Sequence, residues 1–170
     1  KGMHQRVDWA LEMHKQSSVS FFGGLLDTTH HPLHRLEGYN TDDIKNITFN
    51  KTLSRFWFLK KLAESKVALC PSGYIRWTYR HYESILCKCA LASTEIEGYS
   101  LLIPLPIENF MIIRDHEKIS GKIKNMCDNW ETWQTKAEKS YDFLNKFLVN
   151  GNYSKKKPLI FDRFMDQLPH

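Results

Sequence analysis

The sequence predicts an α/β fold built around a mostly parallel sheet. Two observations support this class: short continuous apolar runs alternate with segments of helical periodicity, and Pro, Gly and other turn formers bound the runs. Continuous apolar character, rather than strict alternation with polar residues, is typical of strands that helices cover on both faces. The chain has 170 residues, of which 42% are hydrophobic, so it can form one domain with a helical C-terminal extension.

The first part of the chain predicts two helices and two short strands. Apolar residues recur at helical spacing near both ends of this part, which indicates a helix at each end. The apolar segments between these helices are short and bounded by turn formers, which indicates strands. In chain order we expect a helix over 6–15, a strand over 19–22 that stops at Gly23 and Gly24, a polar loop over 27–40, a strand over 44–49 and a helix over 52–64.

The second part predicts the central strands and the longest helices. Residues 66–70 form an apolar run that ends at Pro71, and residues 89–93 form another. We therefore expect strands over 66–70, 89–93 and 109–113, helices over 77–88, from an Asp115 cap to about Asn129 and over 131–149, and a short amphipathic segment over 159–168.

The expected organisation is an α/β domain over residues 1–130, with the helical extension over 131–170 packed on it. Right-handed crossovers place the carboxyl ends of parallel strands at one edge, where α/β sheets bind ligands. Three loops share that edge in this prediction: 23–35, 71–76 and 93–106.

The charge balance favours neither nucleic acid nor a bilayer span. The formal net charge of +5 is a modest excess that solvated faces explain. Trp130 and Trp133, with Lys136 and Lys139, are interpreted as the core and flank of a helix, so we expect no nucleic-acid partner. No apolar run approaches the roughly 18–20 residues that a transmembrane helix needs, so we expect no such segment in this chain.

The cysteines and the glycosylation sequons point to different compartments. Cys87 and Cys89 form a C-x-C pattern that fits neither a zinc site nor a redox pair, so the four cysteines are interpreted as small buried hydrophobes. Reduced cysteines favour the cytoplasm. Three sequons, at Asn46, Asn50 and Asn152, favour a secretory lumen. Both compartments stay open.

The stretch 69–83 carries the functional argument. A buried strand ends at Pro71, Gly73 permits a sharp turn, and a helix begins near Thr78. The first N–H groups of such a helix and the positive end of its dipole form an anion site. Arg76 and Arg80 flank the turn, and guanidinium groups bind phosphate oxygens in a bidentate manner. This junction therefore predicts a site for a diphosphate.

Glu83 adds a carboxylate to the same predicted helix. Arg76, Arg80 and Glu83 are three or four residues apart, so they are expected to line one side, with Glu83 suited to the hydroxyls of a ribose. The alternative is an ordinary surface ion pair between Arg80 and Glu83, with Tyr79 and Tyr82 in packing roles.

Residues 65–92 resemble the donor-binding core of GT-B glycosyltransferases, particularly the exostosin-like group. The matching positions are Ser65, Lys66, Leu69, Cys70, Pro71, Gly73, Arg80, Glu83 and Cys89, in the family's order. The likeness extends more loosely over 17–130. It implies a Rossmann-like three-layer domain over 1–130 that binds a nucleoside-diphosphate sugar. The expected reaction is transfer of that sugar to an acceptor glycan or glycoconjugate, with no metal or other cofactor.

The resemblance also assigns roles within the site: Arg80 contacts the diphosphate and Glu83 the ribose. Around these two, the expected diphosphate set is Arg76, Thr78, Tyr79, Arg80 and Arg35, and the expected donor-loop glycines are Gly23, Gly24 and Gly73. The chain departs from the family pattern at Lys88, where Gly is usual, and at Ala90-Leu91, where Pro-Val is usual.

No catalytic base is assigned. In GT-B enzymes the inverting base comes from an N-terminal acceptor domain, and 170 residues hold no second Rossmann unit. No second Glu lies eight residues from Glu83, so a retaining mechanism with paired glutamates is unsupported. The chain is therefore expected either to be part of a longer protein or to bind the donor without completing the transfer alone.

The sequence also allows two other interpretations. Asp27, His30, His31 and His34 crowd one loop, but adjacent His30 and His31 point apart in most conformations, so no metal is expected there. The chain could instead be a non-enzymatic Rossmann-like module that recognises a partner protein or an anionic polymer. Strand-edge loops closed over by side chains would favour that module.

Overall fold

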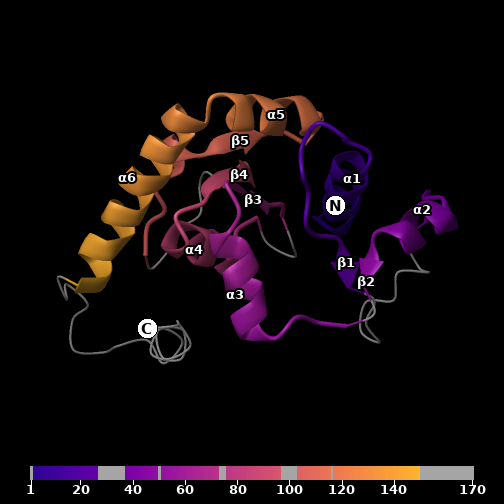
Figure 1. The fold of residues 1–170 in the computed structure, drawn as a ribbon, viewed down its shortest axis with the longest axis horizontal. Coiled ribbons are helices and arrows are strands. Elements are labelled where there is room, and N and C mark those ends of the chain that lie inside the picture. The colour runs from indigo at the N-terminus through magenta and orange to yellow at the C-terminus, as the bar shows by residue number, and fades with distance from the viewer. Residues whose placement is uncertain are drawn as a thin grey trace.

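The computed structural model describes residues 2–26, 37–49, 51–72, 76–96, 103–115 and 117–149 (Figure 1). Helices and parallel strands alternate through these residues. In chain order the elements are α1 (Gly2–His14), β1 (Leu25–Leu26), α2 (Thr41–Asn46), β2 (Thr48–Phe49), α3 (Arg55–Ala63), β3 (Val67–Cys70), α4 (Tyr79–Leu86), β4 (Ala90–Thr94), the 3-10 helix η2 (Ile107–Asn109), β5 (Met111–Ile113), α5 (Ser120–Asp128) and α6 (Trp130–Val149).

The strands form two separate parallel sheets. One has the order β3-β4-β5, with Val67 opposite Ala90 and Ala92 opposite Met111, and the other pairs β1 with β2. All five residues of β4 are buried, as expected for the central strand of a covered sheet. The predicted α/β class with parallel pairing is confirmed. A three-layer Rossmann arrangement stays a prediction.

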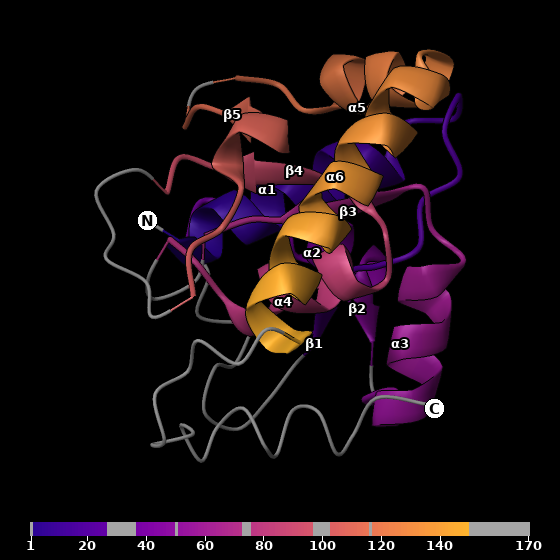
Figure 2. The same ribbon diagram turned by 90° about the vertical axis from the view of Figure 1, so that its left-hand side faces the viewer.

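Alternate residues of β4 face two different parts of the core. Ala90 and Ala92 pack with residues of α1, α5 and the first half of α6, including Trp133. Leu91 packs with α4 and with Leu144 in the second half of α6. Figure 2 shows α6 running obliquely past β4 and α4. The long helix thus contributes side chains to both parts of the core and packs against α4.

The N-terminal strands differ from the prediction. Residues 19–22 form no strand, and β1 instead follows the two glycines. A Cβ built on Gly24 would lie 2.2 Å from the carbonyl oxygen of Ile47, and the Leu25 N–H donates to that oxygen at 2.8 Å. The close approach of the two backbones therefore requires glycine at position 24. This pairing places the strand after the glycines.

The strand expected over 44–49 is wrong in its first half. Residues up to Asn46 belong to α2, and only Thr48–Phe49 pairs as a strand. Asn40 caps α2 by accepting from the Asp42 N–H at 2.8 Å, and both Asp42 and Asp43 favour the positive end of a helix. The Asn40 cap therefore favours a helix here, although the apolar residues of this segment suggested a strand.

The later elements agree with the prediction more closely. Helix α3 begins after the N-cap Ser54, and α4 begins two residues later than expected. Helix α5 begins at Ser120 rather than at an Asp115 cap. The expected segment over 159–168 lies outside the described residues.

Candidate functional site

A hollow lies where the end of β3 meets the start of α4. Its volume is about 190 Å³, and its lining comprises Arg6, Pro71, Thr78, Tyr79, Arg80 and Glu83. Thr78, Tyr79, Arg80 and Glu83 are four of the residues predicted from the sequence to bind a donor. The structure therefore brings these four together at one concave surface.

Arg6 is the lining residue that the sequence analysis missed. It belongs to α1, more than sixty residues before Pro71, and its Nε donates to the carbonyl oxygen of Ser72 at 3.1 Å. No local pattern around position 6 signals this contact. It arises because α1 packs beside the end of β3, which only the tertiary fold specifies.

His81 fixes the first turn of α4 against the end of β4. His81 Nδ1 lies 3.1 Å from the Thr78 nitrogen and 3.0 Å from the Thr78 carbonyl oxygen. The Ser93 hydroxyl donates to the Thr94 carbonyl at 2.9 Å, so its oxygen is left to accept from His81 Nε2, which lies 2.9 Å away, and Nδ1 of the neutral ring accepts from the Thr78 N–H. This chain of hydrogen bonds defines the tautomer and holds the wall of the hollow.

Burial keeps His81 neutral. Burial, helped by the nearby charge of Arg80 and opposed by a hydrogen bond to Thr78, lowers the pKa of His81 to about 4. His81 and Ser93 are both fully buried, and the imidazole donates to the hydroxyl instead of accepting its proton. The pair is therefore structural and is not a nucleophile with its base.

The hollow carries two arginines and one carboxylate that is already paired. Arg80 is exposed, and its guanidinium lies 5.6 Å from the centroid of the Phe58 ring. Glu83 is buried, and its Oε1 lies 2.5 Å from Nη1 of Arg55, the first residue of α3. Arg55 thus balances the Glu83 charge, and the guanidinium groups of Arg6 and Arg80 also line the hollow.

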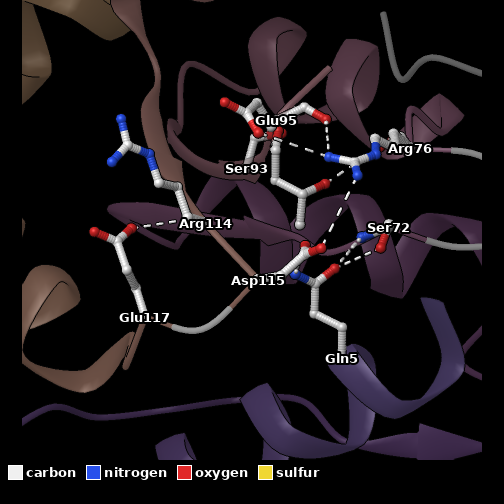
Figure 3. Close-up of polar contacts among 9 residues, drawn as sticks. Gln5, Ser72, Arg76, Ser93, Glu95, Arg114, Asp115 and Glu117 are labelled. Carbon is white, nitrogen blue, oxygen red and sulfur yellow. Dashed lines mark hydrogen bonds and ion pairs between the residues drawn. The ribbon is translucent and has the colours of Figure 1, made fainter. Parts of the chain in front are cut away.

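Arg76 does not join Arg80. Its Nη1 lies 3.9 Å from Glu95 Oε2 and donates to the Glu95 carbonyl at 3.3 Å, and its Nη2 lies 3.9 Å from Asp115 Oδ2. Figure 3 shows Arg76 reaching between these two acidic residues at the carboxyl edge of the sheet. The expectation that Arg76, Arg80 and Glu83 line one side is wrong, because α4 begins at Tyr79 and helical spacing does not extend back to Arg76.

The rest of that edge is cross-linked by polar side chains. Ser72, which follows β3, donates from its N–H and its hydroxyl to Gln5 Oε1 of α1, at 3.2 and 2.5 Å (Figure 3). Gln5 Nε2 in turn donates to Asp115 Oδ1 at 3.5 Å. The ends of β3, β4 and β5 are thus tied together through Ser72, Arg76 and Asp115. The open surface lies beside α4, while the protein's own side chains cover the sheet edge.

The remaining predicted site residues fall elsewhere. Gly23 and Gly24 precede β1 in the two-stranded sheet, where Gly24 packs against the Ile47 carbonyl and the Phe49 ring. Gly73, Arg35 and the loop with Asp27, His30, His31 and His34 lie outside the described residues. Within the described ranges, no group of three His, Cys, Asp or Glu side chains could hold a metal ion.

The cysteines belong to the core and its borders. Cys70 and Cys89 are buried, Cys87 and Cys127 are half-buried, and all four are free thiols. Burial raises the pKa of Cys70 to about 11 and also raises that of Cys89. These thiols therefore stay protonated near neutral pH and offer no thiolate nucleophile.

The fold and the hollow together define an α/β protein with a basic concave surface at the start of a helix. No protein-family model, curated protein or solved structure matches this chain. In the part of the chain that the structure describes, none of the helices combines the length and apolar character needed to cross a bilayer.

Proposed function

We propose that this chain is the donor-binding domain of a GT-B-like glycosyltransferase and that it holds the diphosphate of a nucleoside-diphosphate sugar in the hollow. One observation carries the proposal: Arg80 and Glu83, which match the family-like motif, line the same concave surface as the predicted site residues Thr78 and Tyr79. Arg6 adds a second guanidinium from a distant part of the chain.

The charge and size of the hollow suit a diphosphate. Arg6 and Arg80 supply cationic donors, and the first N–H groups of α4 add the positive end of a helix dipole. The volume of about 190 Å³ is below the roughly 300–1,000 Å³ of complete small-molecule pockets. The hollow therefore encloses the phosphates, and the nucleoside and sugar extend beyond it.

The proposed role of Glu83 is to accept hydrogen bonds from the ribose hydroxyls. Arg55 engages one carboxylate oxygen, and a carboxylate has about four lone-pair positions on its two oxygens. The Arg55 contact fixes the orientation of the Glu83 carboxylate. The ion pair thus pre-organises the carboxylate for this contact.

The proposed chemistry is stabilisation of the leaving diphosphate, not deprotonation of the acceptor. Donors that already point at the hollow stabilise the charge that develops on the leaving group. His81, in the first turn of α4 beside this surface, is neutral and uses both ring nitrogens within the protein. In this proposal an acceptor domain outside the chain supplies the base and binds the glycan or glycoconjugate.

Titration calorimetry with nucleoside diphosphates tests the proposal. Arg80→Ala is expected to weaken binding about 10- to 100-fold, because a hydrogen bond to a charged group contributes about 1.5–3 kcal/mol. Arg114→Ala is the matched control, since it removes the same charge from an exposed residue after β5. Absence of binding by the wild type, or equal weakening by both variants, would refute the assignment.

A specific observation also favours the second candidate, a non-enzymatic module. The carboxyl edge of the main sheet is closed by the Arg76 contacts to Glu95 and Asp115 and by the Gln5–Ser72 contact. Such a module would bind polyanions with a strong dependence on salt and with no preference for nucleotides. A nucleoside diphosphate that competes at physiological salt would exclude it.

A further inference from the structure

Large apolar side chains are exposed around α3. Phe56 and Trp57, in the first turn of this helix, are 57% and 50% exposed, and Phe22 is 56% exposed. Scattered exposed apolar residues need no explanation, but neighbouring aromatic ones often mark a binding surface. We call the following residues the α3 patch: Phe22, Phe49, Leu53, Phe56 and Trp57.

The α3 patch is continuous. The rings of Phe22 and Phe49 lie 6.3 Å apart, and the Lys61 ammonium lies 5.9 Å from the centroid of Phe22. Trp57 is four residues before Lys61 on the same helix, so these side chains are neighbours. Phe56 contacts Trp57 with ring centroids 5.7 Å apart. Residues from the small sheet and from α3 therefore form a single surface.

Lysines lie among these aromatic rings. The Lys60 ammonium is 4.8 Å from the centroid of the Trp57 ring, in addition to the Lys61 contact with Phe22. Residues 51–64 contain four basic side chains and one acidic one, Glu64, which Lys61 binds at 2.8 Å. Since Arg55 pairs with Glu83 as well, the surface is aromatic and carries a modest excess of positive charge.

We propose that the α3 patch docks on an anionic membrane surface. Aromatic rings enter the interfacial region of a bilayer while lysines at the same surface contact anionic headgroups. A protein partner fits less well, because the centres of protein interfaces are depleted in lysine, whereas Lys60 and Lys61 stand among the rings. The charge and the aromatic composition thus select a lipid surface.

Docking would bring the hollow close to the membrane. Arg55, at the start of α3, pairs with Glu83 in the lining of the hollow, and Arg80 lies over Phe58 of α3. These contacts join the helix that carries the patch to the wall of the hollow. The membrane proposal itself does not depend on what the hollow binds.

Co-sedimentation with phosphatidylcholine vesicles, with and without phosphatidylserine, tests the proposal. The wild type is expected to bind only the vesicles that contain phosphatidylserine. Phe56→Ser with Trp57→Ser should weaken binding about tenfold or more, because each buried aromatic ring contributes appreciably. Lys60→Glu with Lys61→Glu should also weaken it at least tenfold, since each basic residue near such a surface contributes about 1 kcal/mol.

Two controls make the experiment specific. Lys124→Glu with Lys139→Glu changes the charge equally on α5 and α6, away from the patch, and should weaken binding much less. Trp57→Phe should retain binding but reduce the blue shift of tryptophan fluorescence on addition of vesicles, because Trp57 is exposed, whereas Trp9 and Trp133 are buried and Trp77 and Trp130 are half-buried. Circular dichroism and nucleoside-diphosphate titration without vesicles show that each variant is folded and separate this test from that of the hollow.

Several results would overturn the proposal. The proposal is wrong if the wild type does not bind vesicles that contain phosphatidylserine, or if it binds both vesicle types equally. It is also wrong if the patch variants and the control variant weaken binding to the same extent. Self-association of the wild type that the patch variants abolish, without vesicle binding, would instead identify a second copy of the chain as the occupant.

Discussion

His81 is completely buried, yet it is polar and both of its ring nitrogens have partners. It accepts from the Thr78 N–H and donates to Ser93, so it ties the first turn of α4 to the end of β4. A protonated imidazole could donate to the Thr78 carbonyl instead, but it would place a charge in the core. Burial therefore favours the neutral ring.

The stability of the protein should consequently fall between pH 7 and pH 5. The pKa of His81 is about 4 in the folded state and near 6.5 when unfolded, so the unfolded chain binds more protons between these values. Stability is fully present above about pH 6.5 and is lost as the pH falls, by about 2 kcal/mol at pH 5. Urea unfolding at both pH values measures the loss.

The matched variants are His81→Asn and His14→Asn. The first removes the buried titrating group and should reduce the pH dependence, while the second changes an exposed residue at the end of α1 and should leave it unchanged. If His81→Asn keeps the full pH dependence, another group causes it.

Single residues also show how far a local pattern reaches. The pattern found Thr78, Tyr79, Arg80 and Glu83 because all lie within one strand–loop–helix junction. It could not find Arg6, which is distant in sequence. It grouped Arg76 with Arg80 by helical spacing, but Arg76 precedes the helix and binds Glu95 and Asp115. The ion pair between Glu83 and Arg55 was equally unpredictable from the local sequence, because it depends on how α3 packs beside α4.

At the scale of secondary-structure elements, the start of α5 depends on another helix. Its N-cap position is Ile119, which has no side-chain acceptor. Glu12 of α1 takes that role: Oε1 accepts from the Ser120 N–H at 2.9 Å and Oε2 from the Ile119 N–H at 3.1 Å. Burial opposes the Glu12 charge, but the hydrogen bonds from Ser120 and Ile119 outweigh it and lower the pKa of Glu12.

Glu12→Ala should destabilise the protein by about 1–2 kcal/mol, because α5 loses its cap and charge-assisted hydrogen bonds are broken. Glu138→Ala is the control, since Glu138 is exposed on α6 and accepts a hydrogen bond at 3.3 Å from the side chain of Gln134 on the same helix. Thermal or urea unfolding of both variants gives the comparison. Equal stability of the two would show that the cap contributes nothing.

Elements were predictable where sequence and tertiary structure agree. The apolar runs of β3 and β4 and the periodicity of α3 and α6 gave the correct type of element, because these segments are covered in the way that their patterns indicate. Residues 19–22 and 44–46 were not predictable in this way. The secondary structure of these residues depends on the close contact of Gly24 with Ile47 and on the Asn40 cap.

At the scale of the whole molecule, both ends of the described chain share one core. Trp9 and Met13 of α1 pack in the same cluster as Trp133 and Ala137 of α6, around Ala92 of β4. Helix α6 continues to Leu144, which is fully buried in a second cluster that includes residues of α4. Helices from the two ends therefore stabilise the sheet together.

This arrangement predicts that a change near the end of α6 weakens the whole protein in one step. Leu144→Ala should destabilise it by about 2–5 kcal/mol, because a fully buried leucine leaves a cavity, while Leu53→Ala at an exposed site should have little effect. Urea unfolding followed by tryptophan fluorescence and by far-ultraviolet circular dichroism should give coincident curves, since the tryptophans of α1 and α6 lie in the same cluster as the central strand. If Leu144→Ala instead separates the two curves, α6 unfolds independently, and the residues after 130 form an appendage that the sheet does not need.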